Sequence, residues 1–531
     1  MPPPDRGLRP HHGRRWGAAA GPCPGRGAAG LLARGGVLSA GAWARRRGLA
    51  ARGERPRCTE GEDPLTDAWI WPPGPPGLPG SSAHEPRRAG DLAVRHPAPD
   101  AVKPEVLLAA LRDGHRDLAA IPSAELVRLV GAAAEALTVE LGSADIEEVA
   151  ANARLSPPMT RVVLDGMAAS WNIGALDRLV RTEFPDPRAL DRFVAETGPP
   201  AGESPDATAK RQVRAAAPPV TLHFGAGSVP GVSVTSMIRA LLVKSAVLAK
   251  PGAGDIALTV RFARLLHGAD PRLAGAVAVQ YWPGGAPRWE SWERRLLTGA
   301  DQVVVQGSDA TIEAIRARAP ASTRLIEHPH RVGVAIVDPE GTPGATASTA
   351  RAAALFDQRG CVSTHLVLLL AGRDRAAQWC GELAASLAAT ATALPAGPSS
   401  PGELSARRQF EGRVAMKAAA SPAMRLWTSD GAGWSVLLGP SEAFEPGGGR
   451  TVWVVPVADP EGALAVLSYL SPVLQTVGLA GLDGHAGFAE ALCSLGATRI
   501  VPLDRVPFPD ADWFHDGSRP LRELVRWGEL R

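Results

Sequence analysis

VTLHFGAGSVPGVSVTSMIRALLVKSAVLAKP, residues 220–251, is the stretch that decides the fold. A β-rich run at 220–224 ends in two closely spaced glycines. Apolar side chains then follow at helical spacing, and a second apolar run ends in Lys250-Pro251. The helical face consists of Val234, Met237, Ile238, Leu241 and Leu242. Strand, glycine turn, helix and strand in this order predict a parallel sheet with crossover helices.

The glycine turn of this unit is a candidate phosphate-binding site. Gly225, Gly227 and Gly231 would let backbone amides approach a phosphate at the start of a helix. Their spacing, G-x-G-x-x-x-G, is one residue longer than the dinucleotide-binding fingerprint. A glycine turn that binds nothing explains the same residues equally well.

Lysine is scarce in this chain, which has five Lys beside 52 Arg. Lys250 would end a strand at the edge where open α/β sheets bind their ligands. Its ammonium is therefore a candidate for holding a ribose hydroxyl or a phosphate. An ordinary solvated lysine is the alternative. Lys244, at the edge of the apolar stripe of the helix, is predicted to be solvated or snorkelling.

The alternation of strand and helix continues along the chain. The predicted elements are a helix near 256–267, a strand at 276–281, a helix at 289–297 and a strand at 301–305. The last strand runs into Gly307 and Ser308, a second glycine-containing turn before a helix. Two such turns at the ends of neighbouring strands favour a cofactor site, although Ser308 as a plain helix cap needs no ligand.

One cysteine stands in a setting suited to catalysis. In FDQRGCVS, residues 356–363, Cys361 follows Gly360 and precedes a predicted helix, whose amide dipoles would lower the pKa of the thiol. Gly360 would leave room for a substrate to reach the sulfur. A buried, inert thiol is the common alternative, and it fits Cys380 and Cys493 better.

Histidines are the other reactive side chains near these segments. His330 is a candidate proton donor to a leaving group, and a structural histidine is the alternative. No His, Cys and Asp residues show metal-ligand spacing, so we predict no metal site.

Composition separates the first hundred residues from the rest. They hold 15 Arg and no Lys against nine Asp and Glu, with 17 Gly and 16 Pro. We therefore expect a disordered tail that can be deleted without loss of activity, with order beginning near Pro104. The formal net charge of +3 belongs to this tail, and the remainder carries three excess negative charges. That balance argues against a nucleic-acid-binding protein.

The cysteine count and the hydropathy pattern indicate in which cellular compartment the protein is expected. Five scattered Cys fit a reducing compartment better than a disulfide framework. The sequence has no run of 18 uncharged apolar residues, so we expect no membrane span and a cytoplasmic enzyme.

In their order along the chain, these segments resemble the aldehyde dehydrogenase superfamily. Within it they resemble the acyl-CoA reductases related to the fatty acid reductase component of bacterial bioluminescence. The resembling segments are 225–250, VVVQGSDATIEAI (303–315), FDQRGCVS (356–363), RIVPL (499–503), HDG (515–517) and LVRW (524–527). The resemblance covers residues 104 to 531 approximately.

The resemblance implies an α/β fold of the aldehyde dehydrogenase type, with a Rossmann-type cofactor-binding domain and an α/β catalytic domain. We expect a disordered Pro/Gly/Arg-rich tail at 1–101. The helical N-terminal part and the dinucleotide-binding domain would occupy 102–338. The catalytic domain and a C-terminal return segment would occupy 339–531.

The resemblance also implies roles for single residues. Cys361 would be the nucleophile that takes the acyl group from CoA as an enzyme thioester. Lys250 would contact the adenosine ribose or its phosphate, and Gly307 and Ser308 would lie beside the cofactor. The helix that begins near Gly231 would run under the pyrophosphate.

Two departures from the family pattern bear on mechanism. Ser228 stands where the family usually has an Asn that helps to stabilise the oxyanion, so Ser228 is a candidate for that role with a single hydroxyl donor. Glu327 stands where aldehyde-oxidising relatives have a catalytic Glu, but no Leu-Gly-Gly follows it. A reductase needs no base to activate water, so the missing motif agrees with reduction.

The sequence therefore predicts an acyl-CoA reductase that makes an aldehyde, with long acyl chains and NADPH suggested by the family and NADH as the alternative. The other hypotheses are an acyl-binding or acyl-transfer protein on the same fold, and a reductase of an acyl phosphate or a carrier-bound thioester. The resemblance leaves open a homo-oligomer or an acyl-transferring partner enzyme.

Overall fold

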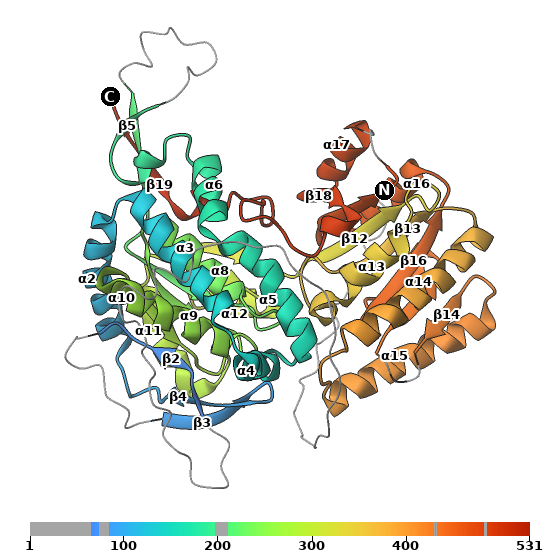
Figure 1. Ribbon diagram of the computed structural model, residues 1–531, viewed down its shortest axis with the longest axis horizontal. Helices are drawn as coiled ribbons and strands as arrows, with labels where there is room; N and C mark the ends of the chain where they lie inside the picture. Colours follow the sequence, from blue (N-terminus) through green and yellow to red (C-terminus); the bar gives the residue numbers. More distant parts are fainter. Residues whose placement is uncertain (1–64, 74–83, 197–210, 430, 432, 483–485) are drawn as a thin grey trace, which may run out of the picture.

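A computed structural model of the protein describes residues 65–73, 84–196, 211–429, 431, 433–482 and 486–531. Two lobes, each built on a mainly parallel sheet, lie side by side, and the C-terminal segment crosses from the second lobe back to the first (Figure 1). Both sheets carry helices, as the alternating sequence pattern predicts. The predicted α/β class is confirmed.

The first lobe is built on a six-stranded sheet in the order β11-β10-β7-β8-β9-β2. Its strands are β2 (Trp69–Ile70), β7 (Val220–Phe224), β8 (Ala246–Lys250), β9 (Val277–Gln280), β10 (Gln302–Gln306) and β11 (Arg324–His328). The strands are parallel except β2, which pairs antiparallel with β9. The chain runs from β7 to β8 and β9 in one direction and from β10 to β11 in the other. The switch point therefore lies between β7 and β10.

The helices of the first lobe share one continuous apolar core with this sheet. They are α2 (Pro104–Ala120), α3 (Ser123–Val139), α4 (Ser143–Ala153), α5 (Pro157–Trp171), α6 (Ile173–Glu183), α8 (Val232–Leu242), α9 (Ile256–Ala269), α10 (Pro271–Ala276), α11 (Pro287–Gly299) and α12 (Asp309–Arg316). The predicted elements between 256 and 308 all appear within a few residues of their expected bounds.

The second lobe is built on a seven-stranded sheet in the order β14-β15-β16-β13-β12-β17-β18. Its strands are β12 (Val332–Val337), β13 (Thr364–Leu370), β14 (Arg425–Thr428), β15 (Ser435–Leu438), β16 (Thr451–Val457), β17 (Leu474–Ala480) and β18 (Arg499–Pro502). Its helices are α13 (Ala345–Ala354), α14 (Arg373–Ala393), α15 (Pro401–Ala420), α16 (Pro460–Leu467) and α17 (Ala486–Ser494). Two apolar clusters line this sheet. Because β12 belongs to it, the sheets divide before the predicted boundary at residue 338.

Two small sheets complete the described chain. One has the order β1-β4-β3, with β1 (Thr66–Asp67), β3 (His84–Ala89) and β4 (Leu92–Pro97). The other has the order β19-β6-β5, with β5 (Val194–Ala195), β6 (Gln212–Ala216) and the C-terminal β19 (Arg526–Leu530). This second sheet forms an arm at the upper left of Figure 1.

The predicted tail ends earlier than expected. Residues 1–64 lie outside the described part of the chain, but four strands lie between Thr66 and Pro97, so the prediction that order begins near Pro104 is wrong. β2 extends the six-stranded sheet, and Trp71 Nε1 donates a hydrogen bond to Gln280 Oε1 at 2.9 Å. Deleting residues 1–100 would therefore remove an edge strand from the first lobe.

Lys244 also differs from its prediction. It follows the end of α8 with a φ of 67° and is 5% exposed. Its Nζ lies 2.5 Å from Asp191 Oδ1 and donates to the Ala119 carbonyl at 3.1 Å. Lys244 is thus a buried, paired cation that joins three segments of the first lobe, and not a solvated side chain.

Candidate active site

The glycine turns predicted to bind the cofactor meet at the switch point of the first sheet. Phe224, the last residue of β7, pairs with Lys250 on one side and with Val305 on the other. The turns that begin at Gly225 and Gly307 therefore leave adjacent parallel strands at the same edge, beside Lys250. Open α/β sheets bind their ligands at this place.

The first turn is packed so closely that glycine is required. A Cβ at Gly225 would lie 2.2 Å from Ser233 Oγ, and one at Gly227 would lie 3.0 Å from the Ala253 and Gly254 amide nitrogens. A Cβ at Gly252 would lie 2.2 Å from the Gly227 nitrogen. The turn after β7 thus lies against the loop after β8, backbone on backbone.

The start of α8 is already occupied by a carboxylate. Gly231, at a φ of 92°, and Ser233 donate their backbone N–H groups to Asp255 Oδ1 and Oδ2 at 2.7 and 2.8 Å. Burial raises the pKa of Asp255 to about 6, although these hydrogen bonds oppose the shift. A phosphate at this turn would therefore be held by other groups, among which Lys250 is the candidate cation.

Lys250 lies beside aromatic rings. Its Nζ is 5.5 Å from the ring centre of Tyr281 and 5.9 Å from that of Trp282, at the end of β9. Burial lowers the pKa of Lys250 to about 8, and the charge of Glu293 opposes this. This setting differs from that of a freely solvated lysine and fits a cation held ready for an anionic ligand.

Ser308 takes the capping position that the sequence allows. Its Oγ accepts a hydrogen bond from the Thr311 N–H at 3.3 Å, so it is the N-cap of α12. A Cβ at Gly307 would lie 3.3 Å from the Thr311 side chain, so any larger residue at this turn would press on Thr311. Ser308 is exposed at the sheet edge and remains able to face a cofactor.

Cys361 lies in the turn between a 3-10 helix (Leu355–Gln358) and β13, and no helix follows it. Burial raises the pKa of its thiol to about 12, the charge of Asp516 adds to the shift, and backbone amides with the charge of Arg499 oppose it. The prediction that helix dipoles lower this pKa is therefore wrong. A raised pKa favours the protonated thiol at neutral pH.

The prediction of a buried, inert thiol is confirmed for one of the other two described cysteines and wrong for the other. Cys380 is fully buried in α14, as expected for an inert thiol. Cys493 in α17 is exposed, so the prediction of burial is wrong for it. Cys23 and Cys58 lie outside the described residues.

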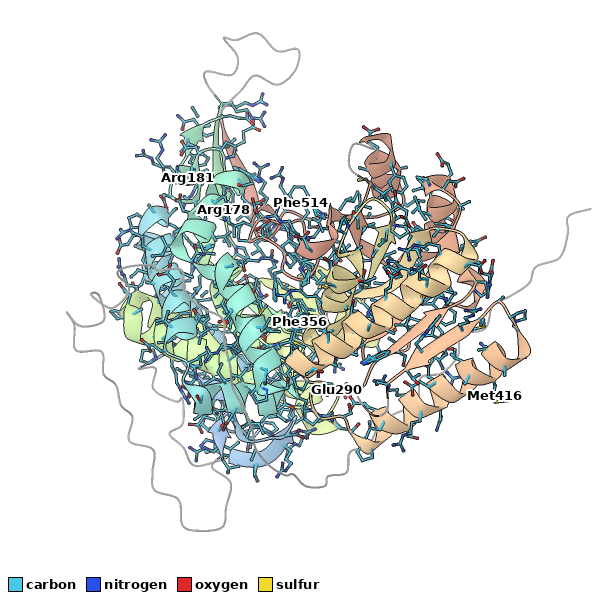
Figure 2. All side chains as sticks on the ribbon, turned by 45° about the vertical axis from the view of Figure 1, so that its right-hand side comes forward. Arg178, Arg181, Glu290, Phe356, Met416 and Phe514 are labelled. Carbon is cyan, nitrogen blue, oxygen red and sulfur yellow. The ribbon has the colours of Figure 1, made fainter. Side chains whose placement is uncertain are left out.

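Cys361 packs against an apolar cluster where the two lobes meet. It gathers side chains from α4, α5, the glycine turn, the segment before β13 and the C-terminal return segment. Its members are Ala153, Leu155, Met159, Val163, Val229, Leu355, Phe356 and Val362, with Phe508 and Trp513 packed against them. Figure 2 shows Phe356 in the middle of the molecule, between the lobes. Because Val229 follows Ser228, the cluster brings the predicted oxyanion residue to the same region as Cys361.

A cavity of about 450 Å³ adjoins this cluster. It is lined by Thr182, residues 498–501, Asp504, Arg505, Phe508, Asp510 and residues 512–514. Phe508 and Trp513 belong to both the cavity wall and the cluster around Cys361, so the cavity is a candidate path for a substrate.

His330 does not occupy the position that its predicted role needs. It is exposed, and its backbone N–H donates to Asp309 Oδ1 at 3.3 Å. Its charge acts instead on His365 of β13, whose pKa burial lowers to about 4. The structure thus offers no described contact between His330 and the Cys361 thiol.

A second polar group, which the sequence reasoning missed, joins the lobes near the thiol. Asp516 Oδ2 accepts from His328 Nδ1 at 2.8 Å, and Oδ1 accepts from Arg331 Nε at 2.8 Å and Gln475 Nε2 at 2.7 Å. Burial raises the pKa of Asp516, but these partners outweigh it and hold the pKa well below its usual value. The HDG segment was visible in the sequence, but its partners lie more than 40 residues away.

His328, His515 and Asp516 also form a group close enough to bind a metal ion, with ligand atoms within 4.8 Å of one another. However, His328, Arg331 and Gln475 already engage both Asp516 oxygens, and Arg331 brings a positive charge. This arrangement favours an internal hydrogen-bond network over a cation.

The two-lobed fold is of the aldehyde dehydrogenase type. Residues 118–527 match the family described as acyl-CoA reductase (LuxC), and the chain belongs to that family. The resemblance seen in the sequence is thereby confirmed.

The similar curated proteins are bacterial reductases. The chain is 26% identical over 315 residues to the long-chain acyl-protein thioester reductase of Aliivibrio fischeri. The matched region covers 58% of this chain and 63% of that protein. It is 23% identical over 364 residues to the enzyme of the same name from Photorhabdus luminescens, covering 67% and 70%. The chain thus spans less than two thirds of the first of these relatives.

Solved structures share the fold at low identity. Aldehyde dehydrogenase 21 of Physcomitrella patens aligns with a TM-score of 0.67 and 12% identity, covering 88% of this chain and 98% of that one. A NAD-dependent benzaldehyde dehydrogenase from Corynebacterium glutamicum aligns with a TM-score of 0.64 and 15% identity, covering 85% and 96%. Ligands of open α/β sheets bind at the edge that the glycine turns and Lys250 form in this chain. Among the described residues, no helix combines the length and apolarity needed to cross a membrane.

Proposed function

We propose that the protein reduces a fatty acyl thioester to the aldehyde through an acyl-enzyme on Cys361, with NADPH favoured over NADH as the reductant. The observation that carries the proposal is the place of Cys361. Cys361 packs against an apolar cluster that contains Val229 of the glycine turn, and Phe508 and Trp513 pack against the same cluster and line a cavity of about 450 Å³. These apolar neighbours suit a fatty acyl chain.

In the proposed reaction, Cys361 Sγ attacks the thioester carbonyl, the bond from that carbonyl to the carrier sulfur breaks, and the thiol proton leaves with the carrier thiol. Ser228, in the turn whose Val229 packs into the same cluster, donates its hydroxyl to the oxyanion. The cofactor, when bound, supplies the reducing equivalents for the acyl-enzyme. Gly307, Ser308 and Lys250 hold it at the switch point.

The raised pKa of the Cys361 thiol means that the thiol proton has to be removed during the reaction. Because burial keeps Cys361 protonated at neutral pH, the proton has to move as the sulfur attacks. Once the bond from the carbonyl to the carrier sulfur has broken, the carrier thiolate is the final acceptor of a proton. An acyl donor with a thiol leaving group fits this site.

The carrier of the acyl group is either CoA or a protein. The family description names acyl-CoA, whereas the similar curated proteins are named for acyl-protein thioesters. We propose acyl-CoA as the substrate in isolation and a protein-bound acyl thioester from an acyl-transferring partner as the second candidate.

Incubation with radiolabelled palmitoyl-CoA should label the protein without NADPH, and adding NADPH should release the label as aldehyde. Cys361→Ser should abolish labelling, whereas Cys380→Ser, the buried control, should keep it. Labelling without NADPH oxidation would favour an acyl-transfer protein over a reductase. Equal loss in both variants would contradict the assignment of Cys361.

A further inference from the structure

The three residues that begin the segment leading to Cys361 have an unusual backbone. Phe356, Asp357 and Gln358 have φ values of 58°, 50° and 61°. The left-handed region is uncommon for residues other than glycine, and three in succession persist only where the surroundings hold them. Each of the three has its own fixed partner.

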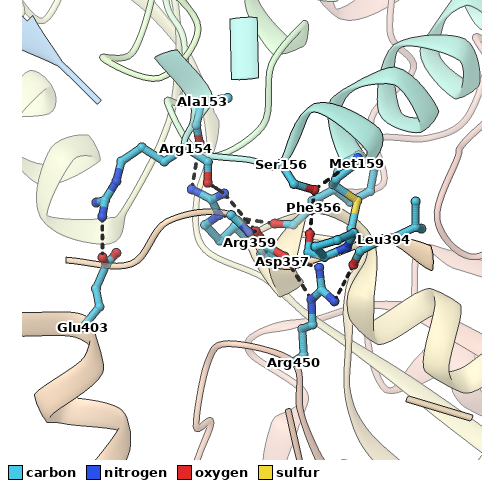
Figure 3. A network of polar contacts seen from close by, with 12 residues as sticks. Ala153, Arg154, Ser156, Met159, Phe356, Asp357, Arg359, Leu394, Glu403 and Arg450 are labelled. Atoms are coloured by element: carbon cyan, nitrogen blue, oxygen red, sulfur yellow. Dashed lines mark hydrogen bonds and ion pairs between the residues drawn. The ribbon is translucent and has the colours of Figure 1, made fainter. Parts of the chain in front are cut away.

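Asp357 is held by a buried arginine. Arg450, whose side chain is 1% exposed, donates from Nε and Nη2 to Asp357 Oδ1 at 3.0 and 2.7 Å. Its Nη1 donates to the Leu394 carbonyl at 2.8 Å, and the Gly397 N–H donates to Asp357 Oδ2 at 3.0 Å. Figure 3 shows Asp357 between Arg450 and Arg359. Arg450 thus holds one carboxylate oxygen with two donors, and the Gly397 amide holds the other oxygen.

The next two residues tie the same turn to both lobes. Gln358 Nε2 donates to the Thr451 carbonyl at 2.6 Å, and its Oε1 accepts from the Thr451 N–H at 2.8 Å, so it joins the start of β16. Arg359 donates to the Ala153 and Arg154 carbonyls at the end of α4, at 3.0 and 2.9 Å. The turn is therefore fastened to the first lobe and to the second.

The turn reaches Cys361 through Phe356. A Cβ on Gly360 would lie 3.2 Å from the Phe356 ring and 3.2 Å from Ser363 Oγ, so the ring packs directly on the residue before the nucleophile. The Phe356 ring also contacts that of Phe508, with ring centres 5.6 Å apart, in the cluster against which Cys361 packs. A change in the backbone at Asp357 would move this ring and the thiol beside it.

We propose that Arg450 and Asp357 are positioning residues that hold the left-handed turn and thereby aim the Cys361 thiol at the acyl carbonyl. The proposal rests on the proposed function, since it takes Cys361 as the nucleophile. Neither residue lines the cavity of about 450 Å³. Their contribution is to the rate of acyl-enzyme formation and not to cofactor binding.

The test replaces the ion pair without leaving a buried charge. Asp357→Asn combined with Arg450→Met removes both charges, and Asn still tolerates a positive φ. The matched control is Asp191→Asn with Lys244→Met, which makes the same kind of exchange at a partly buried pair of the first lobe. Acylation by palmitoyl-CoA, NADPH binding by fluorescence and thermal unfolding are measured on each full-length protein.

We expect the Asp357/Arg450 variant to acylate at least tenfold more slowly, with NADPH affinity unchanged and a midpoint of unfolding within a few degrees of the wild type. The control should acylate at the wild-type rate. A folded Asp357/Arg450 variant that acylates like the wild type would overturn the proposal. A parallel loss of cofactor affinity would show a general structural role and would overturn it as well.

A conservative variant covers the case in which the double variant does not fold. Arg450→Lys keeps the buried charge opposite Asp357 but loses the fork. It should slow acylation and the alkylation of Cys361 by iodoacetamide together, by at least threefold, and unchanged rates would refute positioning. If the wild type itself is not acylated at Cys361, the proposed function fails. Unchanged alkylation in Arg450→Lys would still refute positioning separately.

Discussion

The resting Cys361 thiol should react slowly with electrophiles at neutral pH. Burial, with the charge of Asp516, raises its pKa from 9.0 to about 12. Three pH units at about 1.4 kcal/mol each make the thiolate about 4 kcal/mol less favourable than in a free thiol. At pH 7.5 the thiolate fraction is then lower by about a thousandfold.

Alkylation by iodoacetamide measures this directly. The rate at the Cys361 peptide, followed by mass spectrometry from pH 7 to 10.5, should rise about tenfold per pH unit without a plateau. N-acetylcysteine serves as the reference thiol, and the exposed Cys493 in the same digest reports reagent access to a surface site.

A plateau in the Cys361 rate below pH 9 would refute the reasoning, because it would show a thiolate stabilised in the resting enzyme. The linkage gives a second check. A pKa raised in the folded state contributes stability that is complete below pH 9 and is lost as the pH rises towards 12. The free energy of unfolding should therefore fall over that range in the wild type and less steeply in Cys361→Ser.

Three further predictions concern the first lobe. Gly252→Ala would place its Cβ 2.2 Å from a backbone nitrogen, so it should lower the free energy of unfolding by about 1–3 kcal/mol and weaken NADPH binding. Gly268→Ala is the control, because its Cβ would have nothing within 4 Å, and it should change neither quantity. Thermal unfolding and fluorescence titration measure the two effects. Because burial lowers the pKa of Lys250 to about 8, NADPH affinity should fall as the pH rises above 8, and Lys250→Arg should remove this dependence in a titration series. Deleting residues 1–100 should lower the midpoint of thermal unfolding, and an unchanged midpoint would contradict the role of β2. Trp71→Phe removes one hydrogen bond and should lower the free energy of unfolding in urea by about 1 kcal/mol.

The local sequence pattern was sufficient to predict the strands and helices of residues 220–251. The run 220–251 has the period of a strand, a helix and a strand in turn, and the structure has β7, α8 and β8 there. The same holds for Ser308, whose capping bond is to Thr311, three residues away. Such features depend on neighbours in the chain, so the sequence alone was enough to predict them and to recognise the family.

The state of the candidate site depends on contacts that no local pattern contains. The sequence identified Cys361 as the candidate nucleophile, but its raised pKa comes from burial and from Asp516, which lies 155 positions later in the chain. Arg450 meets Asp357 across 93 residues, and Lys244 meets Asp191 rather than solvent. Burial and ion pairs form only when distant segments of the chain pack together. They set the pKa and the orientation of a reactive side chain, whereas the sequence identifies only which residue it is.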